Sequence, residues 1–475
     1  MTDGLNRRAA RPGACGATLL MLLAVCAGLL SGCVSFGPVG VDPDRSFTGL
    51  RDVLADVGDG GAVDIFLVHG MRADKTQTYA DVIPGVAKRL ALVPATTDST
   101  VMLVPTAPTI TLDGVPVFSR DNWNGFRPRV TVERYHTATG NKQVNFYRFE
   151  YWEALALMKC RLIIAEDTRV VGASARSGFC AQDPYLAPGG ARLSSNSDYG
   201  NRLLKTEIME WGLADAMIAT SAYRTVLHQA VREMFALAVR EARGRDGRPV
   251  DQPGVDAVTE LGQLASSNRT RFAFISESLG SYVVHDALAQ STAQTGAALA
   301  ERAALQPDAN ARAVEAIAPM VVICGASQVH MFANQLALLR FSELQVLGMD
   351  GMDVGGTAQQ LPDDPTPGRA HFFRGCPPPA ALAQSASTPA RFGAQQVVAY
   401  HEPNDLLTYY TSDRPGNVGT GNLNTTNVVV PYTTQWIWFL AADPITAHTG
   451  QPEQAVILDM VACGRAAGQR PSCTH

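Results

Sequence analysis

The chain has 475 residues and a formal net charge of −5, from 39 Lys and Arg against 44 Asp and Glu. This length suits one large domain with insertions or two domains. The slightly acidic balance, without long runs of like charge, gives no indication of nucleic-acid binding, so no nucleic-acid partner is expected.

The N-terminal segment has the pattern of a targeting signal. Arg7, Arg8 and Arg11 form a positive region, and residues 19–30 form an apolar run that is too short to span a bilayer comfortably. The run ends in Leu-Ser-Gly before Cys33, which resembles a bacterial lipobox. The resemblance implies cleavage before Cys33 and lipid attachment to it, with residues 1–32 as signal peptide. A plain secretory signal or a short anchor is the alternative.

Acyl chains on Cys33 would hold the protein at a membrane surface by burying methylene groups in the bilayer. Val34 rather than Asp follows the cysteine. By the same resemblance, this implies sorting to a Gram-negative outer membrane, facing the periplasm or the cell surface. Residues 33–60 are then expected to be a lipidated tether and a short helix, because Phe47 to Val57 carry apolar residues at helical spacing. Residues 61–475 remain for the folded domain.

Six cysteines follow Cys33, an even number that suits disulfides in an oxidising compartment. Six cysteines allow about fifteen pairings. Neighbourhood in the sequence favours the pairs Cys160–Cys180, Cys324–Cys376 and Cys463–Cys473. No cysteine pair has the spacing of a zinc site and the histidines do not cluster, so no metal is expected.

The first expected core strand is Ala62 to Val68, which ends in His69-Gly70-Met71. A glycine at this point lets the backbone approach a substrate closely, although a strand-ending turn with a structural histidine is the simpler interpretation. Residues 79–92 are expected to form a helix, and the alternating residues 145–152 the next strand.

A long interval follows Gly70, and its surplus residues within about 101–265 are expected to form a lid or cap. Residues 101–140 are rich in proline and turns, which indicates an added hairpin layer. Residues 160–204 look loop-like, and 204–243 strongly helical. One stripe of that helical stretch is expected to pack on the sheet: Leu227, Val231, Phe235 and Val239.

A short apolar strand from Phe272 to Ile275 stops abruptly at Ser276-Glu277-Ser278-Leu279-Gly280, and a helical pattern follows. Small residues two before and two after a serine, between a strand and a helix, are the layout of a nucleophile elbow. Gly280 meets this requirement fully, and Ser276 stands where glycine is usual. The turn would expose the Ser278 hydroxyl and aim the first helical N–H groups, that of Leu279 included, at a developing oxyanion. The alternative is an ordinary serine-rich turn.

Further strands are expected at Pro319 to Ala326, Gln396 to Tyr400 and Val428 to Tyr432. His330 is expected on a helix near the mouth of the site. Asp405 follows the second of these strands, and His448 is expected in a loop before a helical stretch from Ala455 to Cys463.

Taken in this order, the motifs resemble the α/β-hydrolase family. The resemblance implies a mostly parallel sheet with helices on both faces. It also implies Asp405 as the acid and His448 as the base of a triad with Ser278, because the family's order is Ser, then Asp or Glu, then His. His69-Gly70 would supply a second oxyanion donor, the backbone N–H of Met71.

Other residues compete for these roles. Glu402 is the nearest rival acid and Asp443 a third choice, while Asp405 could instead be the N-cap of a helix that starts at Leu406. His401 is expected at the surface or in support of the site. His285, within the elbow helix, and His475, at the chain end, compete poorly with His448.

The resemblance implies a membrane-tethered serine hydrolase that needs no metal or organic cofactor. By family analogy, its default substrates are lipid esters or other acyl esters. A non-catalytic envelope lipoprotein that binds a partner through this scaffold is one alternative, and a peptidase or amidase on the same fold is another.

Overall fold

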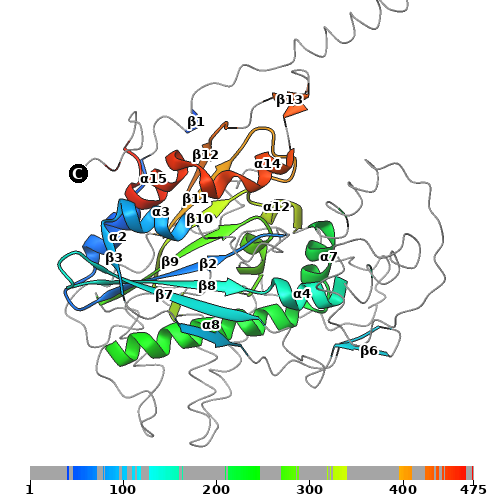
Figure 1. Cartoon of the computed structure of the whole chain (residues 1–475), viewed down its shortest axis with the longest axis horizontal. Helices are drawn as coiled ribbons and strands as arrows, with labels where there is room; N and C mark the ends of the chain where they lie inside the picture. Colours follow the sequence, from blue (N-terminus) through cyan, green and yellow to red (C-terminus); the bar gives the residue numbers. More distant parts are fainter. Residues whose placement is uncertain are drawn as a thin grey trace, which may run out of the picture.

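The structure is a computed structural model, and it describes a defined part of the chain. The described residues are 40–41, 46–71, 79, 81–95, 99–103, 110–112, 115–118, 128–159, 163, 209, 212–245, 269–284, 286–287, 318, 321–322, 325–339, 395–408, 423–432, 435–437, 441–442, 444–466 and 473. They form an α/β fold around one large, mostly parallel sheet, in agreement with the class predicted from the sequence (Figure 1).

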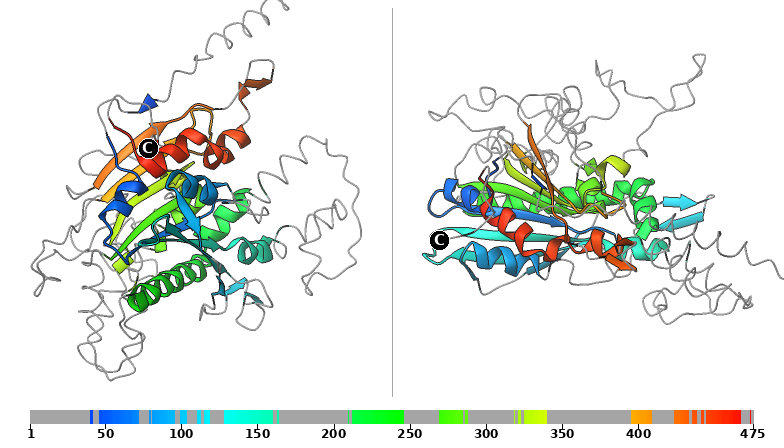
Figure 2. Two further views of the ribbon diagram at one scale, coloured as in Figure 1. Left: turned by 60° about the vertical axis from the view of Figure 1, so that its left-hand side comes forward. Right: turned by 90° about the horizontal axis from the view of Figure 1, so that it is seen from above.

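The main sheet has ten strands in the order β1-β12-β11-β10-β9-β2-β8-β7-β3, and β4 also pairs with β7. The strands are β1 (Gly40–Val41), β2 (Ala62–Val68), β3 (Leu92–Pro94), β4 (Ser99–Met102), β7 (Arg129–Thr137), β8 (Gln143–Glu150), β9 (Thr270–Glu277), β10 (Ala326–Phe332), β11 (Gln395–His401) and β12 (Leu423–Val429). The six strands from β12 to β8 are parallel, whereas β1, β7, β3 and β4 pair antiparallel at the edges. Figure 2 shows the progressive twist from β12 to β7 that is normal for such a sheet.

Helices cover both faces of the sheet. The helices are α2 (Leu50–Asp56), α3 (Val82–Arg89), α4 (Trp152–Lys159), α7 (Ala214–Thr220), α8 (Arg224–Arg245), α12 (Leu336–Leu339), α14 (Pro444–Thr449), α15 (Ala455–Cys463) and the 3₁₀ turn Gln451–Glu453. One core packs α8, α4 and α7 against the sheet, and a second core packs α2, α3 and α15 against the opposite face (Figure 1). Two small hairpins lie apart from the main sheet: β5 (Ile110–Leu112) with β6 (Val115–Phe118), and β13 (Gln435–Ile437) with β14 (Ala441–Ala442).

The sequence predicts the central strands β2 and β9 well because nearly all of their residues are buried. Every residue of β2 is buried, as expected for a strand that is covered on both faces. The chain pairs β8 on one side of β2 and β9 on the other, so the order of the strands reverses at β2. Ligands of open α/β sheets bind at such a reversal, beyond the carboxyl ends of the strands.

The predicted apolar stripe of α8 packs on the sheet as expected, because its four residues are fully buried: Leu227, Val231, Phe235 and Val239. A buried polar contact anchors the end of the same helix. Arg245 Nη2 donates to Asp64 Oδ2 at 2.6 Å, and Asn145 Nδ2 donates to Asp64 Oδ1 at 2.7 Å. The carboxylate of β2 is therefore paired rather than left as an isolated buried charge.

Several predictions of local structure are wrong. The strand predicted from Val428 to Tyr432 is displaced, because β12 spans Leu423–Val429. Residues 101–140 do not form only an added hairpin layer, because β4 and β7 extend the main sheet. The strand predicted from Pro319 to Ala326 is displaced, since residues 321–322 are helical and β10 begins at Ala326. His330 lies within β10, fully buried, and not on a helix.

The predicted Cys463–Cys473 disulfide is present, with 5.5 Å between the two Cα atoms. It closes the C-terminal end of α15, whose bounds match the prediction. Cys33 and the other predicted disulfide partners (Cys160, Cys180, Cys324 and Cys376) lie outside the described residues, as do the signal segment and much of the expected cap. In the part of the chain that is described, no helix is both long and apolar enough to cross a membrane.

Candidate active site

Ser278 lies in a strained turn between β9 and the helical residues 279–284. Its φ is 52°, a left-handed value that non-glycine residues seldom adopt. Such strain is characteristic of a nucleophile elbow, in which the serine stands at the top of the sheet. The Ser278 N–H donates to the Phe332 carbonyl at 2.8 Å, which extends the pairing of β9 with β10. An oxyanion donor from the elbow must therefore come from a later N–H, as predicted for Leu279.

The two glycines of the site are required because the end of β2 and the elbow approach closely. A Cβ on Gly280 would lie 2.2 Å from the Val68 carbonyl oxygen and 2.5 Å from that of His69. A Cβ on Gly70 would lie 2.6 Å from Ser278 Cβ. The end of β2 thus packs directly against the elbow. Ser276 fits where glycine is usual, and its hydroxyl is 3.0 Å from that of Ser281 in the first helical turn.

His69 braces the loop that follows β2. Its Nδ1 is 2.8 Å from the Gly70 carbonyl, and its Nε2 accepts from the Tyr151 N–H at 3.3 Å. The carbonyl can only accept and the amide can only donate, so the ring is neutral with its proton on Nδ1. Burial also lowers the pKa of His69 to about 4. The Tyr151 ring stacks on the imidazole at 4.2 Å, and its hydroxyl donates to the His69 carbonyl.

This bracing fixes the peptide between Gly70 and Met71. In a trans peptide the carbonyl and the following N–H point in opposite directions. Because the Gly70 carbonyl faces the His69 ring, the Met71 N–H faces away from that ring. Gly70 itself lies against Ser278, so the loop is in position to present this N–H near the serine.

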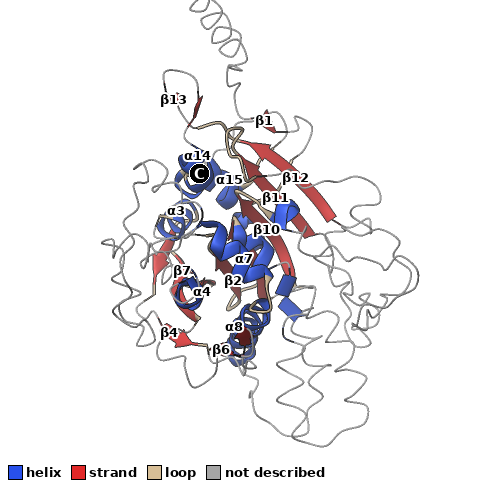
Figure 3. Cartoon of the chain, turned by 90° about the vertical axis from the view of Figure 1, so that its right-hand side faces the viewer, coloured by secondary structure: helices blue, strands red, loops and turns tan. Residues whose placement is uncertain are grey.

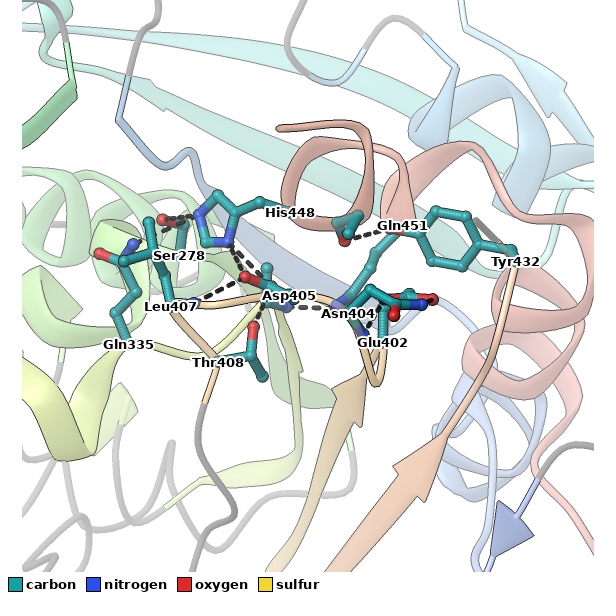
Figure 4. Close-up of polar contacts among 12 residues, drawn as sticks. Ser278, Gln335, Glu402, Asn404, Asp405, Leu407, Thr408, Tyr432, His448 and Gln451 are labelled. Carbon is teal, nitrogen blue, oxygen red and sulfur yellow. Dashed lines mark hydrogen bonds and ion pairs between the residues drawn. The ribbon is translucent and has the colours of Figure 1, made fainter. Parts of the chain in front are cut away.

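The three predicted triad residues come together at the carboxyl ends of the strands (Figure 4). His448 Nε2 is 2.7 Å from Ser278 Oγ, and His448 Nδ1 is 2.9 Å from both carboxylate oxygens of Asp405. All three are buried, with exposed fractions of 2% for Ser278, 8% for His448 and 7% for Asp405. A carboxylate that accepts from Nδ1 leaves Nε2 free to accept the serine proton.

Asp405 is held by its own turn as well as by His448. Its carboxylate accepts from the Leu407 N–H at 2.9 Å and from the Thr408 hydroxyl. Burial alone would raise the pKa of Asp405, but hydrogen bonds from His448, Thr408 and Leu407 outweigh it and lower the pKa below its usual value. The predicted helix from Leu406 is absent, since residues 406–407 form a turn. Asp405 thus holds its own turn and also contacts His448, two roles that the sequence leaves as alternatives.

His448 lies in the short helix α14, not in the predicted loop. Pro444 at the start of α14 is well suited to a first helical position. The Tyr432 hydroxyl donates to the carbonyl of Ala447, immediately before His448. The backbone before His448 is therefore held by the segment that follows β12, and its imidazole by Asp405. Figure 3 looks at this end of the sheet, with α4, α7 and α14 in front of the strands.

The rival residues Glu402 and His401, which the structure describes, have other partners. The Glu402 carboxylate accepts from the backbone and side-chain amides of Asn404, so it braces the turn before Asp405. His401 is buried and not at the surface, and its Nε2 is 2.9 Å from Asn427 Oδ1. Asp443, His285 and His475 lie outside the described residues.

Gln335 also contacts the site, although no sequence motif singles it out. Its Nε2 is 3.3 Å from His448 Nε2, and only 1% of the residue is exposed. Gln335 lies two residues after Ala333, whose N–H donates to the buried Gln451 Oε1 at 2.8 Å. No motif marks a glutamine in such a loop, because its position depends on contacts between distant segments.

The chain was compared with protein-family models, curated proteins and solved structures. No protein-family model, no curated protein and no solved structure matches the chain. The assignment of a function therefore depends on the geometry of the site.

Proposed function

We propose that this protein is a serine hydrolase with the α/β-hydrolase fold. The observation that carries the proposal is the continuous chain of contacts from Ser278 through His448 to Asp405, at 2.7 Å and 2.9 Å, with the serine in a left-handed turn. The strand reversal at β2 supports the fold assignment, because ligands of open α/β sheets bind beyond the carboxyl ends of the strands at such a reversal.

In the proposed reaction, Ser278 Oγ attacks an acyl carbonyl while its proton moves to His448 Nε2. Asp405 holds the imidazole in the reactive tautomer and stabilises its charged form. The N–H groups of Leu279 and Met71 stabilise the oxyanion of the tetrahedral intermediate. The imidazolium then protonates the leaving group, and water releases the acyl group from Ser278. No metal or organic cofactor takes part in this scheme.

The proposed substrates are carboxylic esters, lipid esters included. The proposal also includes lipid attachment at Cys33 and a location on a bacterial envelope membrane, probed by palmitate labelling of wild type and Cys33→Ala. A labelled Cys33→Ala variant would contradict attachment at this residue.

The direct test is labelling with a fluorophosphonate probe, together with turnover of a p-nitrophenyl ester. Wild type should be labelled on Ser278 and should turn over the ester. Ser278→Ala should do neither, with an unchanged thermal unfolding midpoint. Full turnover by Ser278→Ala would refute the proposal. An unlabelled, inactive wild type that retains a stable partner in a pull-down would favour a binding role instead.

A further inference from the structure

Gln335 lies where a reacting oxygen must approach the catalytic imidazole. Its Nε2 is 3.3 Å from His448 Nε2, the nitrogen that is 2.7 Å from Ser278 Oγ. Gln335 Oε1 is buried and has no hydrogen-bond partner among the described residues. A buried amide oxygen without a partner is unfavourable, so a hydrogen-bond donor that binds beside it would be stabilised.

The amide is not needed to hold the resting imidazole. Neutral His448 has one lone pair at Nε2 when Nδ1 donates to Asp405. The Ser278 hydroxyl is the closer donor to that lone pair, at 2.7 Å against 3.3 Å for Gln335. The hydrogen-bonding capacity of Gln335 therefore remains largely unused until Ser278 is acylated and no longer donates.

Deacylation needs an oxygen at this place. A water molecule must lie within hydrogen-bond distance of His448 Nε2, with one O–H directed at that nitrogen and an oxygen lone pair directed at the acyl carbon. Its second O–H then needs an acceptor. Gln335 Oε1 belongs to the amide beside the same nitrogen and is free to accept.

We propose that Gln335 positions the hydrolytic water through its side-chain oxygen. This proposal rests on the proposed serine-hydrolase function. The water oxygen bonds to the acyl carbon as one water proton moves to His448 Nε2. The tetrahedral intermediate then expels Ser278 Oγ, which recovers that proton, and the carboxylic acid leaves. Gln335 is thus a positioning residue that acts in deacylation and contributes little to acylation.

The test separates the two half-reactions with a p-nitrophenyl ester. Gln335→Leu should keep the initial burst of p-nitrophenol, while the following steady rate falls by up to about 100-fold, the scale of losing precise positioning. Mass spectrometry should find acyl-Ser278 accumulating in this variant. Rates are expressed per burst site, so only folded enzyme is counted, and Gln335→Met is a second variant if Gln335→Leu does not fold.

Methanol provides a sharper readout, because it has a single O–H. That O–H is used by His448, so methanol does not need the Gln335 acceptor. Gln335→Leu should therefore raise the ratio of methanolysis to hydrolysis by about the factor by which hydrolysis falls. Loss of structure alone would slow both reactions together and leave the ratio unchanged.

Gln396→Leu is the matched control. Gln396 is also a buried glutamine, but its oxygen accepts from Thr48 near the amino end of β11, away from the site. The ratio of methanolysis to hydrolysis in Gln396→Leu should equal that of wild type. An unchanged ratio in Gln335→Leu, or an equal change in Gln396→Leu, would overturn the role of Gln335. A wild type that is neither labelled by the fluorophosphonate nor able to turn over the ester would instead refute the hydrolase proposal itself.

Discussion

Adding one methyl group to Gly280 should disable the site while leaving the rest of the fold in place. The new Cβ would meet the Val68 carbonyl oxygen at 2.2 Å, whereas ordinary contacts between carbon and a carbonyl oxygen are about 3.3 Å or longer. The end of β2 and the elbow must therefore separate by about 1 Å. Both clashing atoms are main-chain carbonyls, so no side-chain rotation can relieve them.

This separation should lower the rate of the proposed reaction more than it lowers the free energy of unfolding. A misplacement of about 1 Å can reduce a rate by about 100-fold, and overpacking of this kind costs about 1–3 kcal/mol. The loop that carries Met71 follows the same strand, so the proposed oxyanion donors, the N–H groups of Leu279 and Met71, would lose their alignment with Ser278. We therefore expect Gly280→Ala to lower kcat/KM for a p-nitrophenyl ester by about 100-fold or more, with slower fluorophosphonate labelling.

Gly244→Ala is the control for this substitution. Gly244 is exposed near the end of α8, and a Cβ there would meet nothing within 4 Å. Alanine in a helix is more stable than glycine by up to about 1 kcal/mol, so this variant should be slightly stabilised and fully active. Wild-type activity in Gly280→Ala would show that β2 and the elbow do not approach as described, and the reasoning would fail.

Three further predictions concern charge, acid stability and the disulfide. Asp405→Asn should lower the acylation rate by about 10⁴-fold without unfolding, because the amide oxygen still accepts from the Leu407 N–H; a loss below tenfold would point to another acid. Burial lowers the pKa of three histidines in the folded state below the ordinary value near 6.5, so the unfolded state binds more protons. The free energy of unfolding should therefore fall as pH drops from about 6.5 to 4, by up to about 1.4 kcal/mol per pH unit for each histidine. They are His69 (pKa about 4), His330 (pKa about 3) and His401 (pKa about 4). Urea unfolding across this range measures the slope, and a flat profile would contradict it. Cys463→Ser with Cys473→Ser should lower the free energy of unfolding by about 3 kcal/mol, and a reducing agent should affect wild type but not the double variant.

The strands that position the site were predictable because burial on both faces gives continuous apolar runs. Ala62–Val68 was predicted with the observed bounds, and the strand before Ser278 was recognised from its apolar core. The abrupt change from apolar to small residues then marked the turn. These signals are local, since each depends on residues that are adjacent in the chain.

β10 was misplaced because its sequence mixes polar residues with apolar ones. His330 and Gln328 are buried in this strand. A search for continuous apolar runs would exclude a strand that contains such polar residues. Their polar atoms have partners from distant segments: His330 Nδ1 is 3.1 Å from the Tyr400 hydroxyl, and Gln328 Nε2 donates to Thr48 Oγ1 at 2.9 Å. Only the folded chain brings these partners together, so the sequence alone favours the neighbouring apolar stretch.

The same reasoning separates the triad from Gln335. Ser278, Asp405 and His448 each follow a recognisable element, and their order along the chain limited the choice. Gln335 has neither a motif nor a required order. Its position is fixed by the turn after β10 and by the Gln451 side chain, more than a hundred residues further on.

Asp405 is oriented by its own turn as well as by His448, which bears on how the proposed triad is assembled. A carboxylate has about four lone-pair sites, so one side chain can hold its turn and still accept from an imidazole. The Leu407 N–H and the Thr408 hydroxyl orient the Asp405 carboxylate from within its own turn. His448→Ala should therefore leave that turn intact, and added imidazole should restore part of the ester turnover because the acid is already aimed. The absence of rescue at any imidazole concentration, in a variant with wild-type thermal unfolding, would show that His448 itself orients Asp405.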